Sequence, residues 1–212
     1  MRNALLALVV VLAACDAKPS ASWVSITVLP KFTPASGGSM VLVPGTFHVD
    51  VHPVTQELYQ KVMGVNPSKQ KNPAAPASGV QWVDAARFCN KCSEMDGLKP
   101  CYDLKTWDCD PAADGYRLPT ETEWEQACRA GGAGRFPFDD DASQLGRFAW
   151  TKGNSEGKIH PVGQKEPNAW GLQDMLGNVW QWTNDWSDPV EKKQRVLRSG
   201  AWDVDQIGRA HV

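Results

Sequence analysis

The sequence predicts one loop-rich domain, built from a few helices and short strands around buried indole rings, with a short appendage at its N-terminus. Its 212 residues fit one domain of ordinary size plus an extra segment. Ten tryptophans accompany 18 glycines and 15 prolines, and glycine and proline interrupt regular elements. Aromatic residues are plentiful and no Gly-X-Y period occurs, which excludes disordered and collagen-like classes.

The charge balance excludes a large nucleic-acid-binding surface. Lys and Arg number 22 and Asp and Glu 24, so the formal net charge is -2. Binding of nucleic acid requires a basic face, and we therefore expect no nucleic-acid partner. No internal apolar run approaches the roughly 20 residues that a membrane-spanning helix needs.

The first 14 residues have the pattern of an export signal. Arg2 precedes an almost unbroken apolar run over residues 4–14, which is too short to span a membrane in the mature protein. The run ends in Leu-Ala-Ala-Cys, which resembles the bacterial lipobox and implies lipidation of Cys15. The alternative is an ordinary signal peptide with Cys15 as a bystander. We expect a signal peptide over residues 1–14, a membrane partner through the lipid on Cys15, and a location at the bacterial cell envelope, on the periplasmic side or the cell surface.

A tether is expected between this signal and the domain. Residues 15–38 are rich in Ser, Pro, Ala and Gly. The apolar residues 23–29 fit a short strand within the tether or the first strand of the domain. A strand interrupted by a Pro-Gly turn follows at residues 40–47.

Three helices are predicted from their end signals and their apolar periodicity. Thr55 has the place of an N-cap for a first helix that Gly64 ends. Thr120 and Glu123 form a capping box at the start of the third helix, and Gly131 ends it. The second helix has an apolar stripe of Trp82, Ala85, Ala86, Cys89 and Cys92. Only loops and short strands are expected after the third helix.

Cysteine spacing indicates two different roles. Cys89 and Cys92 have C-x-x-C spacing, but no second pair and no histidine pair complete a zinc site. We favour burial of these two as small core residues, ahead of a disulfide and a metal site. Cys128 shares an apolar helix face and is also expected in the core. An exported location permits disulfides, and we predict one between Cys101 and Cys109, which lie in a loop.

No catalytic residue is assigned from sequence. The G-x-S-x-G pattern around Ser155 is typical of a nucleophile elbow, which requires a helix directly after the serine. Pro161 follows too closely for that helix. Residues 174–182 combine a carboxylate, amides, a glycine and carbonyl oxygens, which are ligands that calcium takes from short loops. A plain Gly-Asn turn between packed indoles explains this loop equally well.

Several short blocks in a fixed order are the most specific signal. They are Met-Val-Leu-Val-Pro-Gly at 40–45, Pro-Val-Thr-Gln at 53–56, Val-Gln-Trp at 80–82, Phe-Cys-Asn at 88–90, Gly-Tyr-Arg-Leu-Pro-Thr-Glu at 115–121, Glu-Trp-Glu at 123–125, Pro-Asn-Ala-Trp-Gly-Leu at 167–172, Gly-Asn-Val-Trp at 177–180 and Arg-Val-Leu-Arg at 195–198. This set resembles the formylglycine-generating enzyme family, also called the sulfatase-modifying factor family. The resemblance implies a single α+β domain with little regular secondary structure, related to C-type lectins.

The resemblance also implies a chemistry that this chain lacks. In the family's enzymes, two cysteines after an Arg-Gly-Gly-Ser block bind copper and use oxygen to convert a sulfatase cysteine to formylglycine. That block falls on residues 198–202, which places the two cysteines at Val204 and Arg209. Without a thiolate there is no soft ligand for Cu(I), so we do not expect copper.

Two functions follow from this comparison with the family. The first is a non-catalytic binding or accessory module on an exported lipoprotein, with a peptide or glycan-like ligand. The alternative is a metal-dependent oxidoreductase of the same family, formylglycine-generating or of the non-haem iron type, whose catalytic residues lie in a missing C-terminal part.

The family's calcium loop also maps onto this chain. By resemblance, the ligands are the side chains of Asp174 and Gln181 and the carbonyls of Gly177 and Val179. The family has Glu where this chain has Gln181, and the lost negative charge lowers the affinity expected. Calcium is the cofactor that the sequence predicts.

The last six residues of the sequence are unlike the continuation that the resemblance to the family implies. Ile-Gly-Arg-Ala-His-Val is the translation of a common sequencing adapter, whereas family members continue with further strands. We therefore expect residues 206–212 to derive from an adapter and the domain to cover residues 39–205. On this interpretation the domain is incomplete at its C-terminus.

Overall fold

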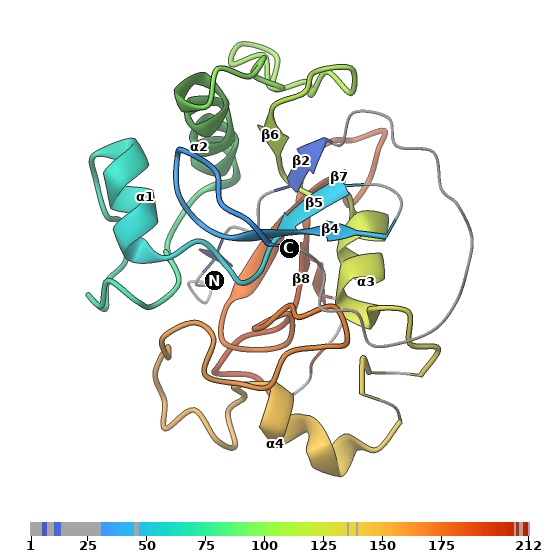
Figure 1. Ribbon diagram of the computed structural model, residues 1–212. Coiled ribbons are helices and arrows are strands. Elements are labelled where there is room, and N and C mark those ends of the chain that lie inside the picture. The colour runs from blue at the N-terminus through green and yellow to red at the C-terminus, as the bar shows by residue number, and fades with distance from the viewer. Residues whose placement is uncertain are drawn as a thin grey trace.

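Two small sheets and three helices of at least two turns carry the part of the chain that the structure describes (Figure 1). The computed structural model describes residues 6–7, 11–13, 31–44, 47–134, 136–138, 140–205, 207 and 210–211. Long loops join the elements, so the predicted α+β fold with little regular secondary structure is confirmed. Helices α1 and α2 lie on one side of the central strands and α3 on the other (Figure 1).

The first sheet is antiparallel and has the order β3-β4-β5-β2-β6. Its centre is the predicted hairpin, in which Met40 pairs with Asp50 and Val43 with Phe47. Because alternate side chains of a strand face opposite sides, this register gives the sheet two apolar faces to cover. The strands are β2 (Val11–Ala13), β3 (Lys31–Phe32), β4 (Met40–Val43), β5 (Phe47–Asp50) and β6 (Tyr116–Arg117).

The second sheet has the order β1-β7-β8-β9. Its main pair is antiparallel and contains a register shift between Trp182 and Trp186. The strands are β1 (Leu6–Ala7), β7 (Trp180–Trp186), β8 (Arg195–Arg198) and β9 (Ala210–His211). The outer strands β1 and β9 come from the segments expected to be signal peptide and adapter product. Cleavage before Cys15 and the adapter origin stay predictions, and Cys15 lies outside the described residues.

The three predicted helices form, with the predicted N-caps. Thr55 accepts a hydrogen bond from the Leu58 backbone at the start of α1 (Gln56–Met63), and Gly64 ends it in the left-handed conformation. Helix α2 covers Trp82–Met95. The capping box of Thr120 starts α3 (Glu121–Arg129), which ends at a left-handed Ala130 rather than at Gly131. Beyond α3, the described helices are the single turns η1 (Ala142–Gln144) and α4 (Leu145–Phe148).

Two large apolar clusters form most of the core, and a small third one contains Ala75, Ile159 and Val179. One lies beneath α1 and α2, and its largest fully buried side chains are Phe88, Met40, Leu118 and Leu197. The other packs α3 against the hairpin and includes Trp124, Val41, Val43, Phe47 and Leu172. Cys89, Cys92 and Cys128 are buried among these residues, as predicted. No helix in the described ranges has the length and apolarity needed to cross a bilayer.

Indole N–H groups tie the second sheet to the segment before α2. Trp82 Nε1 donates to the carbonyl oxygen of Thr183 at 2.9 Å, and Trp182 Nε1 donates to that of Val80 at 3.0 Å. Buried donors need partners, and each indole here satisfies its own N–H on the other element. This reciprocal pair holds α2 against β7.

Gly115 gives a test of this packing. A Cβ at position 115 would collide with the carbonyl oxygen of Lys99 and with Ser93 Oγ, which accepts from the Tyr116 backbone at 2.8 Å. We expect Gly115→Ala to lower the free energy of unfolding by about 2–3 kcal/mol, the usual effect of overpacking a core. Gly153→Ala is the control, because its nearest neighbour is Thr151 Oγ1 at 3.9 Å. Urea denaturation measures both variants, and equal losses would contradict the packing described.

Candidate functional site

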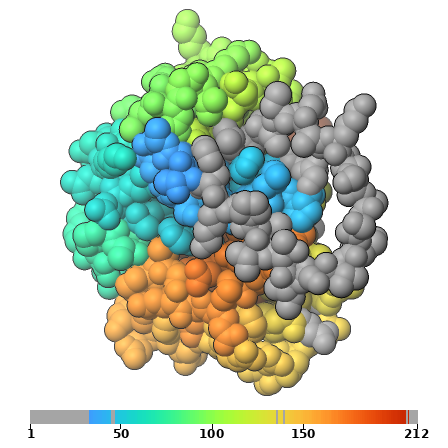
Figure 2. All heavy atoms as spheres, viewed as in Figure 1, coloured from blue at the N-terminus to red at the C-terminus, as the bar shows by residue number. Residues whose placement is uncertain are grey.

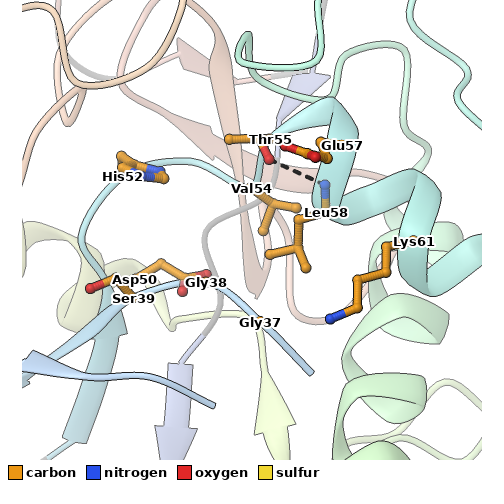
Figure 3. Close-up of a pocket in the computed structure, with 10 residues that line it drawn as sticks. All are labelled: Gly37, Gly38, Ser39, Asp50, His52, Val54, Thr55, Glu57, Leu58 and Lys61. Carbon is orange, nitrogen blue, oxygen red and sulfur yellow. Dashed lines mark hydrogen bonds between the residues drawn. The ribbon is translucent and has the colours of Figure 1, made fainter. Parts of the chain in front are cut away.

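A cavity of about 270 Å³ opens between α1 and residues 37–39 (Figure 3). Sequence reasoning missed it, because it assigned residues 15–38 to a tether. In the structure the end of that segment packs against α1, and Figure 2 shows it in blue beside the teal residues of that region. The cavity is lined by Gly37, Gly38, Ser39, Asp50, His52, Val54, Thr55, Glu57, Leu58 and Lys61.

Glycine conformations and one aspartate hold this wall in place. Gly37 and Gly38 have φ of 117° and 96°, which favour glycine, and a Cβ at Gly37 would lie 2.9 Å from Leu58 Cδ1. Ser36 donates its backbone N–H to Asp96 Oδ1 at 2.7 Å and its hydroxyl to Oδ2 at 2.9 Å. The segment therefore belongs to the folded domain from about residue 36 onward.

Opposite charges stand at the two ends of the cavity. Asp50 is 7% exposed and lies at one end, whereas the ammonium of Lys61 lies at the other (Figure 3). The side chains of Val54 and Leu58 lie between them (Figure 3). Lys61 Nζ also donates to the carbonyl oxygen of Ser36 at 2.9 Å, which fixes its position on the wall.

The loop predicted to bind calcium is buried and lies next to the segment that carries Val51 and His52. Asp174 is 2% exposed, and its Oδ2 accepts from the Gly163 backbone at 2.6 Å. Burial raises the pKa of Asp174, against the effect of that hydrogen bond and of the neighbouring His52. A buried carboxylate of this kind is a reasonable cation ligand.

The side chain of Gln181 already makes two hydrogen bonds. Its Nε2 donates to the carbonyl oxygen of Asp174 at 2.7 Å, and its Oε1 accepts from Trp124 Nε1 at 2.6 Å. The carbonyl oxygen of Gly177 accepts from Ser199 Oγ at 3.1 Å. Asp174, Gly177 and Val179 lie in the loop before β7, and Gln181 lies in β7 itself. The oxygens of Gln181 and Gly177 already accept hydrogen bonds. These hydrogen bonds compete with a metal ion for the two oxygens, and calcium binding stays a prediction.

The Gly-Asn turn at residues 177 and 178 has a structural role of its own. A Cβ at Gly177 would collide with the backbone of Trp150, and the Asn178 backbone donates to the Trp150 carbonyl at 2.8 Å. The Asn178 side chain accepts from the His160 backbone and donates to the His160 carbonyl, both at 3.0 Å. The packed-turn interpretation of this loop therefore has direct support in the structure.

The predicted disulfide partners lie together as free thiols. A hydrogen bond with Cys109 and burial raise the pKa of Cys101 far above its ordinary value. The same hydrogen bond lowers the pKa of Cys109, and so does the positive charge of Arg117. The backbone of Asp110 donates to the Cys101 carbonyl at 2.8 Å, which keeps the two segments side by side. The disulfide itself stays a prediction.

Metal-binding clusters of the usual kind do not occur in the described residues. Within those ranges, no three side chains of His, Cys, Asp or Glu are close enough together to hold a metal ion. Val204 lies in a turn, where its carbonyl oxygen accepts from the Lys152 backbone at 3.1 Å. Arg209 lies outside the described residues.

Comparison with known proteins identifies relatives. Residues 35–210 match the family model described as "Sulfatase-modifying factor enzyme 1-like domain". "Chaperone protein LppX" of Paenibacillus barcinonensis is 29% identical over 203 residues, which cover 78% of this chain and 72% of the relative. "Inactive C-alpha-formylglycine-generating enzyme 2" of Mus musculus is 31% identical over 169 residues, 75% of this chain, and the chain spans about half of that relative's length, 48%.

A solved structure shows the same fold. "Treponema denticola variable protein 1" superposes with a TM-score of 0.73 and 29% sequence identity, over 96% of this chain and 88% of that chain.

Gln181→Glu tests how the amide affects metal binding. The new carboxylate repels the Asp174 carbonyl that Gln181 now donates to, so we expect the variant to be destabilised by about 1–3 kcal/mol without metal. Calcium adds an opposite charge, and we expect it to raise the Tm of the variant by several degrees and that of the wild type much less. Thermal melts with calcium or with EDTA measure this. An equal response of the two proteins would show that the amide does not limit binding.

Oxidation tests the pairing of Cys101 with Cys109. With oxidised glutathione we expect two thiols to disappear, because the two cysteines lie on paired segments and the pKa of Cys109 is lowered, which favours thiol–disulfide exchange. Thiol titration measures the loss, and peptide mapping by mass spectrometry identifies the bond. Cys109→Ser should prevent the loss, whereas Cys128→Ser, which removes a buried thiol elsewhere, should leave it unchanged. A bond between Cys89 and Cys92 instead would contradict the prediction.

Proposed function

The chain belongs to the sulfatase-modifying factor enzyme 1-like domain family, and we propose that it is a non-catalytic binding or accessory module carried by a lipoprotein at the cell envelope. The observation that carries this proposal is Val204, at the position where the resemblance places the first copper cysteine. The side chain of valine offers no ligand to a metal. A thiolate is the ligand that Cu(I) requires, so the copper chemistry of the family has no starting point at this residue.

The first residues of the block before Val204 make contacts that stabilise the fold. Arg198, at the start of the corresponding block, forms ion pairs with Glu121 and Glu125 of α3 and lies 4.8 Å from the ring centre of Trp124. Ser199 is fully buried, and its hydroxyl donates to the Gly177 carbonyl. These contacts join β8 to α3 and to the 174–181 loop. They give Arg198 and Ser199 structural roles.

Two relatives support a role other than catalysis. The mouse relative is named as inactive, and the relative from Paenibacillus barcinonensis is named as a chaperone. A chaperone-like accessory protein contacts polypeptide chains, and the charged cavity beside α1 supplies a place for such contact. The lipobox-like sequence before Cys15 supports attachment to a membrane.

A formylglycine assay tests the proposal. The purified chain, loaded with copper, is incubated in air with a peptide that contains the sulfatase-type cysteine, and mass spectrometry follows the conversion of thiol to aldehyde. We expect no product above the protein-free control, because position 204 lacks a thiolate. An active formylglycine-generating enzyme run in parallel shows that the assay works. Turnover by this chain would overturn the proposal in favour of an oxidoreductase.

A further inference from the structure

We propose that the cavity between α1 and residues 37–39 binds a short peptide with free ends, of about two residues and with apolar side chains. This inference rests on the proposed binding function and names the ligand class and the site. It starts from the order of groups along the cavity, which is acid, hydrocarbon and base (Figure 3). A peptide with apolar side chains is complementary to this order, because its N-terminal ammonium can face the acid, its side chains the hydrocarbon and its C-terminal carboxylate the base.

The acidic end suits an ammonium group. Asp50 is only 7% exposed, so water screens its charge less than at an open surface. A carboxylate has two oxygens and accepts several hydrogen bonds, so it can receive an ammonium while keeping other contacts. Hydrogen bonds between ionised groups are roughly twice as strong as those between neutral groups.

The basic end suits a carboxylate. Lys61 Nζ uses one donor on the Ser36 carbonyl at 2.9 Å, and an ammonium has three. Its other donors remain for a ligand. The contact with Ser36 also holds the ammonium at the cavity wall, which reduces the entropy lost when a ligand binds.

The middle of the cavity suits hydrocarbon. Val54 is 2% exposed and Leu58 is half-buried, and both side chains lie between the charged ends (Figure 3). Apolar ligand surface buried here contributes roughly 25 cal/mol per Å². The volume of about 270 Å³ lies just below the roughly 300–1,000 Å³ of sites for drug-sized ligands, which limits the occupant to about two residues.

The charges also exclude other ligand classes. A simple cation is repelled by Lys61 and a simple anion by Asp50, so each end discriminates against one class. A neutral glycan satisfies neither charge. A single amino acid carries both charges on one carbon, whereas the side chains of Val54 and Leu58 lie between the two charged ends of the cavity (Figure 3). A peptide of two residues matches Asp50, the hydrocarbon of Val54 and Leu58, and Lys61.

Hydrogen bonds hold the segment of residues 36–39, which forms one wall of the cavity, in a fixed position. Asp96 accepts from the backbone and hydroxyl of Ser36 and from the hydroxyl of Tyr116, at 2.7, 2.9 and 2.6 Å. Asp96 follows α2 directly, Tyr116 lies in β6, and Lys61, which donates to the Ser36 carbonyl, lies in α1, so three parts of the fold hold the segment that forms the wall. A cavity that exists before binding spends less binding energy on ordering its walls.

Calorimetry of the purified full chain with the dipeptide Leu-Ala tests the inference. We expect binding, and at least tenfold weaker binding when the peptide is N-acetylated or when its C-terminus is amidated, because each change removes one charge. Lys61→Met should weaken binding of Leu-Ala and should abolish the difference between the free acid and the amide. Asp50→Asn should also weaken binding of Leu-Ala, and it should abolish the difference between the peptide with a free N-terminus and the N-acetylated peptide.

Lys71→Met is the matched control. Lys71 is an exposed lysine that also donates to a backbone carbonyl, that of Asn66 at 2.7 Å, but it does not line the cavity. Binding by this variant should equal that of the wild type. Asp50 is buried, and circular dichroism will show whether Asp50→Asn still folds. If it does not, the comparison of Lys61→Met with Lys71→Met tests the peptide site, because both lysines are exposed.

The outcomes separate this inference from the proposed function. Absence of Leu-Ala binding, equal binding of the blocked peptides, or equal effects of Lys61→Met and Lys71→Met would overturn the peptide site. None of these results bears on catalysis. Formylglycine production would overturn the proposed function whether or not the cavity binds Leu-Ala.

Discussion

The fold depends most on a buried asparagine that bonds with four backbone groups of other loops. Asn178 is fully buried, and its φ of 60° is unusual for a residue other than glycine. Its backbone donates to Trp150 and accepts from Trp202, while its side chain pairs with both backbone groups of His160. A domain with long loops and small sheets has many backbone groups that no helix or sheet satisfies. Side-chain amides can supply those partners because each carries both donors and acceptors.

The same device recurs through the structure. Gln56 accepts from the Asn72 backbone and donates to the Gln70 carbonyl, which fixes the loop after α1. Asn90 pairs with both backbone groups of Tyr102, at 2.7 and 3.0 Å. Asn168 donates to carbonyls at the end of α3 and accepts from two backbone groups of its own turn. Each amide is buried, so removing one would leave several polar groups without partners, which is more costly than losing a single exposed hydrogen bond.

Gln181 belongs to this set, which gives its amide a physical explanation. A glutamate at the same place could not donate to the Asp174 carbonyl, and its charge would need a cation nearby. The amide replaces that requirement with two neutral hydrogen bonds, to Asp174 and from Trp124. The hydrogen bond between Gln181 and Trp124 thereby joins β7 to α3. The ion pairs of Arg198 with α3 strengthen the same junction from β8.

The sequence by itself determined the elements whose causes are local. The capping box of Thr120, the N-cap Thr55 and the left-handed Gly64 each depend on residues within one helical turn, and the structure has all three. The family blocks likewise indicated the fold, because each block is a short run of consecutive residues that can be recognised in the sequence without knowledge of the rest of the structure. The end of α3 differed, since Ala130 takes the left-handed conformation one residue before the predicted glycine.

Only the tertiary structure decided the sites. Ser36 meets Asp96 across 60 positions of the chain, and Trp124 meets Gln181 across 57, so no local pattern signals either contact. The cavity beside α1 exists because the first of these contacts brings residues 37–39 against the helix. The contact between Trp124 and Gln181 is the reason that the Gln181 oxygen already accepts a hydrogen bond. Local propensity acts over one turn or one hairpin, whereas a cavity or a ligand set depends on which distant backbone groups a buried amide or carboxylate satisfies.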